Sequence, residues 1–176
     1  AMLARAGMQG PHLPFEGKAG WCDHVAGMRF SLDTLGGDQT PYSILDTRIK
    51  NRPAAGPAIA PILAAEKVAP LDIRNVRRVV MEVHRMSKDK TGPGEPPWEL
   101  ASREDADHST PYLVAAALRD GMVTLESFDD SHLLDPELRA LMQKVEVVEN
   151  AAFTQAYERL PQQNHARITV TMNNGQ

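Results

Sequence analysis

Apolar and polar side chains alternate along several segments of the chain, a pattern that predicts strands. The clearest segment covers residues 76–86, in which Val79, Met81 and Val83 fall on one face. The other strands are predicted at residues 42–49, 144–149 and 167–173. Because the opposite face of residues 76–86 is mixed, with Arg78, Val80, Glu82 and His84, we expect helices to cover only one side of the sheet.

Three further stretches repeat apolar side chains at helical spacing. They cover residues 57–68, 111–118 and 136–143. Thr110 before Pro111 fits an N-cap followed by proline at the first helical position, and Gly121 fits a stop after the last turn. Asp135 before Pro136 repeats the cap and proline. The pattern predicts an α+β fold: a two-layer sandwich whose mainly antiparallel sheet is covered by helices on one face.

The composition indicates one globular domain over residues 1–176, with 42% hydrophobic and 24% charged residues. No run approaches the roughly 18 apolar residues of a membrane span, and Arg5 interrupts the apolar stretch near the N-terminus, so we expect a cytoplasmic protein. Cys22 is the only cysteine, which excludes an internal disulfide and a cysteine-based zinc cluster. We interpret Cys22 as a small, partly buried apolar side chain.

The net charge of −4 is unevenly distributed, with basic residues concentrated at 67–90 and acidic residues at 95–158. A basic stripe can bind nucleic acid. However, Arg77, Arg78 and Arg85 have no aromatic residues between them to stack on bases. We therefore expect a solvated sheet face and no nucleic-acid partner.

A dense polar cluster precedes the helix predicted at residues 111–118. If that helix begins after Thr110, then Asp107, His108 and Ser109 lie beside free backbone N–H groups at the positive end of the helix dipole. Such a position favours bound anions, and a carboxylate substrate fits it.

Short motifs along the chain occur in the order found in a known family. They are Gly10-Pro11 with Phe15-Glu16-Gly17-Lys18, Ile49-Lys50-Asn51-Arg52-Pro53, Ser102-Arg103-Glu104-Asp105-Ala106-Asp107-His108-Ser109 with Pro111-Tyr112, residues 133–145, and Ile168-Thr169-Val170-Thr171-Met172-Asn173-Asn174-Gly175. Together they resemble the MmgE/PrpD family, which includes 2-methylcitrate dehydratase, cis-aconitate decarboxylase and iminodisuccinate epimerase.

The resemblance implies a two-domain architecture, in which a helical domain made from both ends of a longer chain carries an inserted α+β lid. Residues 1–176 resemble the lid. The hairpin signal Asn174-Gly175 close to the last residue agrees with a fragment of a longer protein. The family also implies a homodimer at full length, a small carboxylate substrate, and catalysis without a metal or organic cofactor. The isolated chain would then lack the helical domain and be inactive.

Lys50 matches the lysine of the family's Lys-x-x-Pro stretch, which implies that its ammonium binds a substrate carboxylate or donates a proton. The alternative is an exposed lysine at the end of a strand. His108 is the second catalytic candidate because its ordinary pKa of about 6.5 lies near working pH. It is equally able to serve as a structural group at the helix entry. Ser109 and Tyr112 are candidates for substrate binding, with core packing as the alternative for Tyr112.

In the family, a histidine often follows the proline of the Lys-x-x-Pro stretch by a few residues. Here that proline is Pro53, and Pro57 or a near neighbour holds the position of the histidine. This departure leaves room for a variant substrate or for lost activity. The resemblance favours a lyase that dehydrates or decarboxylates a di- or tricarboxylate such as 2-methylcitrate or cis-aconitate. One alternative is an isomerase or epimerase, which also begins with proton abstraction. Another is a non-catalytic interaction module.

Overall fold

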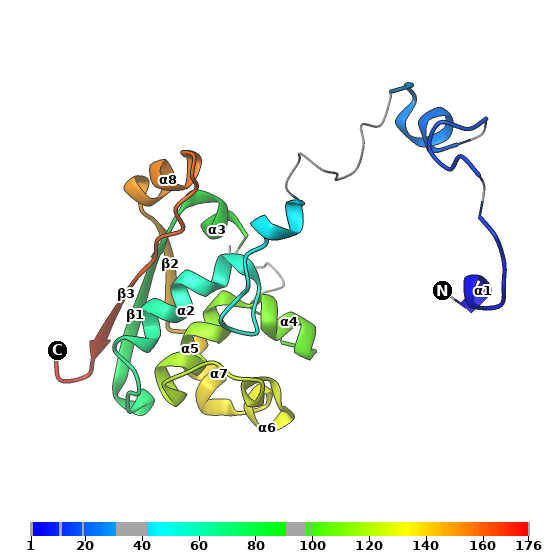
Figure 1. Ribbon diagram of the computed structural model, residues 1–176. Coiled ribbons are helices and arrows are strands. Elements are labelled where there is room, and N and C mark those ends of the chain that lie inside the picture. Colours follow the sequence, from blue (N-terminus) through cyan, green and yellow to red (C-terminus); the bar gives the residue numbers. More distant parts are fainter. Residues whose placement is uncertain are drawn as a thin grey trace. The chain divides into compact units, whose positions relative to one another are not determined.

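The computed structural model describes residues 2–10, 12–18, 20–30, 42–90, 98 and 100–175. The chain divides into two compact units, Ala1–Arg48 and Ile49–Gln176. The sheet and the helices packed on it belong to the second unit (Figure 1). Over the described residues, no helix is both long and apolar enough to cross a membrane.

The first unit contains short helical turns and no strand over its described residues. The turns are α1 (Met2–Arg5), the π-helical η1 (Cys22–Ala26) and the 3-10 helix η2 (Ser43–Asp46). Cys22 is buried, as expected. The strand predicted at residues 42–49 is wrong, because η2 occupies its middle and Ile49 is 94% exposed. An alternating pattern forms a strand only where a neighbouring strand pairs with it, and this segment pairs with none of the described strands.

The sheet has three strands, β1 (Val76–Val83), β2 (Val145–Glu149) and β3 (Arg167–Met172), in the order β2-β1-β3. β1 pairs with β3 in antiparallel fashion and with β2 in parallel fashion. The sheet is therefore mixed, whereas the sequence predicted a mainly antiparallel one. The helices that connect β1 to β2 return the chain to its starting edge, so the two strands run in the same direction.

The α+β prediction is confirmed by a core between β1 and one layer of helices. Val79, Met81 and Val83 are at most 2% exposed, so the predicted apolar face is the buried one. The main packing helices are α2 (Ile59–Glu66), α5 (Thr110–Asp120) and α7 (Pro136–Met142). The shorter elements are η3 (Gly56–Ala58), η4 (Ile73–Asn75), α3 (Arg85–Asp89), α4 (Arg103–His108), η6 (Glu126–Phe128), α6 (Asp130–Leu133) and α8 (Ala151–Glu158). Figure 1 shows α2 and α5 side by side along the sheet.

A turn follows β3 at the Asn174-Gly175 signal. The Gly175 N–H donates to the Met172 carbonyl at 3.0 Å, and Gly175 has a φ of 84°. Glycine adopts this left-handed conformation more readily than other residues do, which accounts for a glycine at this position.

Candidate functional site

The polar cluster of residues 103–109 forms a helix of its own, contrary to the single helix start that the sequence predicted. Ser102 caps α4 by accepting a hydrogen bond from the Asp105 N–H at 3.2 Å. Ser109, and not Thr110, caps α5 by accepting from the Tyr112 N–H at 3.3 Å. Gly121 ends α5 in the left-handed conformation, as predicted. The cluster therefore lies along α4 and at the junction between two helices.

Asp105 belongs to the start of α4. Its Oδ2 accepts hydrogen bonds from the Ser102 hydroxyl at 2.8 Å and the Ala101 N–H at 3.1 Å. These bonds lower the pKa of Asp105, and the bond from the Ser102 hydroxyl makes the largest contribution. Asp105 is thus a reciprocal partner of the Ser102 cap.

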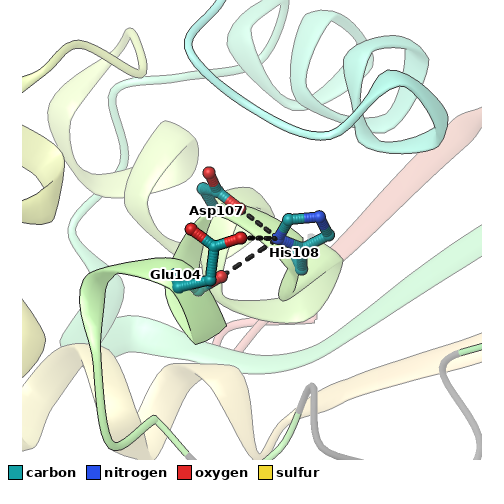
Figure 2. A group of neighbouring side chains, drawn as sticks. All are labelled: Glu104, Asp107 and His108. Carbon is teal, nitrogen blue, oxygen red and sulfur yellow. Dashed lines mark hydrogen bonds and ion pairs between the residues drawn. The ribbon is translucent and has the colours of Figure 1, made fainter. Parts of the chain in front are cut away.

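His108 is held through one of its two ring nitrogens. Its Nδ1 lies 3.0 Å from the Glu104 carbonyl oxygen and 3.9 Å from the Glu104 carboxylate, and it also contacts Asp107 Oδ1 (Figure 2). A proton on Nδ1 can donate to the Glu104 carbonyl, which leaves the lone pair of a neutral imidazole on Nε2. The side chain is 60% exposed. His108 is therefore held through Nδ1, and a proton on that nitrogen leaves Nε2 as the acceptor atom of the ring.

The same three residues are the described group that could hold a metal ion. Ligand atoms of Glu104, Asp107 and His108 all lie within 4.8 Å of one another. A cation bound at Nδ1 would displace the hydrogen bond from that nitrogen to the Glu104 carbonyl. The contacts around Nδ1 instead orient the imidazole ring. That the site binds no metal stays a prediction.

Lys50 lies in the irregular segment that precedes η3, and its Nζ donates to the Ala54 carbonyl at 3.0 Å. The predicted strand end at this position is wrong, because no strand precedes it among residues 42–49. This hydrogen bond holds the Lys50 side chain against the backbone of its own loop. Two donor protons of the ammonium remain for other partners.

A partly buried ion pair anchors the Lys50 segment to α2. The Arg52 guanidinium makes two bonds to the Glu66 carboxylate of α2, at 2.7 and 2.6 Å, and the two side chains are only 17% and 11% exposed. The hydrogen bond to Glu66 raises the pKa of Arg52. Glu66 Oε1 also accepts from the Val123 N–H at 3.2 Å. Sequence spacing gave no signal for this pair, because its partners lie fourteen residues apart in different elements.

One backbone hydrogen bond brings the Lys50 segment and the His108 helix together. The Ala55 N–H donates to the Asp107 carbonyl at 3.0 Å. The loop that carries Lys50 is thereby fixed against the end of α4, which carries His108. Two candidates that are 58 positions apart in the sequence therefore come from adjoining segments of the fold.

Ser109 and Tyr112 are both buried at the junction of α4 and α5. Besides capping α5, Ser109 is 0% exposed. The Tyr112 hydroxyl donates to the Ser127 carbonyl, and burial raises the pKa of Tyr112 to about 12. Tyr112 therefore packs in the core, which was the alternative interpretation. Contact of either residue with a substrate stays a prediction.

The fold and the site define an α+β domain that presents an ammonium and an oriented imidazole from adjoining segments. A model of the MmgE/PrpD C-terminal domain matches residues 54–176. The chain belongs to the MmgE/PrpD family. The matched span contains His108 and begins four residues after Lys50.

Curated relatives of the chain carry the name 2-methylcitrate dehydratase. The chain is 33% identical over 86 residues to the mitochondrial enzyme of Yarrowia lipolytica, an alignment that covers 49% of this chain and 15% of that protein. It is 33% identical over 88 residues to the Cupriavidus necator enzyme, covering 49% and 17%. It is 30% identical over 96 residues to the probable 2-methylcitrate dehydratase of Saccharomyces cerevisiae, covering 54% and 17%. The chain thus aligns with less than a fifth of the length of each relative.

Proposed function

We propose that this chain is the lid portion of a cofactor-independent lyase that acts on a small di- or tricarboxylate such as 2-methylcitrate or cis-aconitate. The family match and the names of the relatives support this reaction class. The observation that carries the site is the hydrogen bond from Ala55 to Asp107, because it sets the Lys50 segment against the helix of His108.

Lys50 and His108 divide the chemistry in this proposal. The Lys50 ammonium binds a substrate carboxylate, and a positive charge there also stabilises the negative charge that develops when the neighbouring carbon loses a proton. His108 Nε2 accepts that proton, while Glu104 and Asp107 hold the imidazole through Nδ1. Expulsion of hydroxide then completes a dehydration. In a decarboxylation the carbon–carboxylate bond breaks instead, carbon dioxide leaves, and the electron pair left on carbon takes a proton from protonated His108.

The substrate in this proposal lies between the lid and a helical domain supplied by the rest of a longer protein. We further propose that the full-length protein is a homodimer in the cytoplasm, with neither nucleic acid nor membrane as a partner. The Yarrowia lipolytica relative is named as mitochondrial, so location is a property to be measured for this protein.

The test is product analysis by proton NMR, with the full-length protein and 2-methylcitrate or cis-aconitate in deuterated water. Formation of an alkene from 2-methylcitrate, or of the decarboxylated alkene from cis-aconitate, supports a lyase. Deuterium exchange with inversion and without an alkene would replace the lyase by an epimerase. Turnover by the isolated 176 residues would refute the idea that the lid needs a helical partner.

A further inference from the structure

A pocket lies away from the Lys50 segment, at the edge of the sheet where two parallel strands end. β1 leads into α3 and β2 leads into α8, so both helices begin at this edge and lie beside each other (Figure 1). The space between them measures about 570 Å³. Ligand pockets in proteins have volumes of roughly 300–1,000 Å³, and in open α/β sheets ligands bind at the carboxyl ends of the strands. Both the size and the position therefore suit a small ligand.

A pair of stacked rings forms part of the floor of the pocket. The rings of His84 and Tyr157 lie 3.8 Å apart between centroids with an angle of 8° between their planes. His84 is 2% exposed; its Nδ1 accepts from the Ser87 N–H at 3.4 Å, and its Nε2 lies 2.9 Å from the Ser87 hydroxyl. The Tyr157 hydroxyl donates to the sulfur of Met86 at 3.7 Å. The buried His84 ring supports the half-buried Tyr157 ring, whose flat surface suits a planar apolar group.

Charged side chains surround this floor. Arg85 and Glu158 form an ion pair of 2.7 Å in which both side chains are more than half exposed, so their charges largely cancel at the rim. Asp89 and Lys90 complete the charged part of the lining. Burial, followed by the positive charge of Lys90, lowers the pKa of His84.

We propose that this pocket binds a small organic monocarboxylate with a planar apolar body. The body lies against the Tyr157 ring, which is stacked on the buried His84, and beside Met86, and the carboxylate pairs with the Lys90 ammonium. The pocket draws its residues from α3, α8 and their flanks, whereas the proposed catalytic groups come from α4 and the segment before η3. The inference therefore stands whether or not the lyase proposal holds.

The test is a titration of the 176-residue chain with benzoate, followed by amide NMR spectra. We expect saturable shifts at the amides of α3 and α8. Lys90→Gln should weaken binding by about tenfold, the equivalent of about 1.4 kcal/mol, and Tyr157→Leu should weaken it further. Lys67→Gln is the matched control, because it removes an exposed lysine outside the lining and should leave the affinity unchanged.

Neutral and cationic analogues sharpen the test. Benzyl alcohol has the ring without the charge and should bind about tenfold more weakly than benzoate. Shifts confined to the neighbourhood of Lys50 and His108, or an undiminished affinity of Lys90→Gln, would overturn the proposal. Preferential binding of phenethylamine would also overturn it, because Asp89 and Glu158 would then dominate the pocket.

Discussion

The ion pair between Arg52 and Glu66 provides a direct test of how the Lys50 segment is held. The substitution Glu66→Gln keeps the shape of the side chain and an oxygen that can accept from the Val123 N–H. It removes the negative charge and leaves the Arg52 guanidinium without its carboxylate. Because the two side chains are 17% and 11% exposed, water can replace only part of the lost interaction.

The expected loss follows from this burial. Removing one partner of a fully buried pair costs roughly 3–5 kcal/mol, and the small remaining exposure lowers our expectation to about 2–4 kcal/mol. With a urea dependence of about 2 kcal/mol per molar, the middle of the range for small proteins, the midpoint of unfolding should fall by about 1–2 M. The pair Arg85–Glu158 has the same chemistry but side chains that are 58% and 57% exposed. Glu158→Gln should therefore cost less than about 1 kcal/mol.

The assay is urea unfolding of the 176-residue chain, followed by far-ultraviolet circular dichroism, for the wild type and both variants. A double-mutant cycle with Arg52→Met isolates the coupling between the two side chains. If Glu66→Gln loses no more stability than Glu158→Gln, burial does not make the Arg52 pair strong. The reasoning that ties the Lys50 segment to α2 would then be wrong.

Three further predictions concern the junction of α4 and α5. Tyr112 has a pKa of about 12 in the folded chain and about 10 when unfolded, so the free energy of unfolding should be unchanged below pH 10 and fall by about 2–3 kcal/mol as the pH rises to 12. Urea unfolding across this range should show this loss in the wild type and not in Tyr112→Phe. Ser109→Ala removes the cap of α5 and should cost about 1–2 kcal/mol in thermal or urea unfolding, and a loss below 0.3 kcal/mol would contradict the capping role. Nitrogen NMR should show neutral His108 mainly protonated at Nδ1, and Asp107→Ala should lower that population; a wild-type signal for protonated Nε2 would exclude the arrangement in Figure 2.

The local patterns predicted the parts of the fold that depend on neighbouring residues. Alternation identified the buried face of β1, and Asp135 before Pro136 located the start of α7. The direction of β2 was beyond such patterns, because it depends on how the helices between β1 and β2 return the chain. The failed strand at residues 42–49 has a related cause, since strand formation needs a pairing partner that sequence periodicity does not identify.

The candidate site was predictable as residues but not as an arrangement. The resemblance pointed to Lys50 and His108, while the bond from Ala55 to Asp107 that joins their segments involves backbone atoms, which leave no mark in the sequence. Asp107 was assigned to a helix start, although its carboxylate contacts the imidazole of His108. Long-range backbone contacts and side-chain rotamers decide such details, and both require the folded chain.

The most direct test of the account is turnover of 2-methylcitrate by the full-length protein carrying Lys50→Ala or His108→Gln. We expect kcat/KM to fall at least about 100-fold in each variant, the lower range for the loss of a positioned acid–base group or charge. The controls Lys67→Ala and His165→Gln alter an exposed lysine and an exposed histidine elsewhere and should remain within about twofold of the wild type. Undiminished turnover by folded Lys50→Ala and His108→Gln proteins would contradict the claim that these two segments form one wall of the active site.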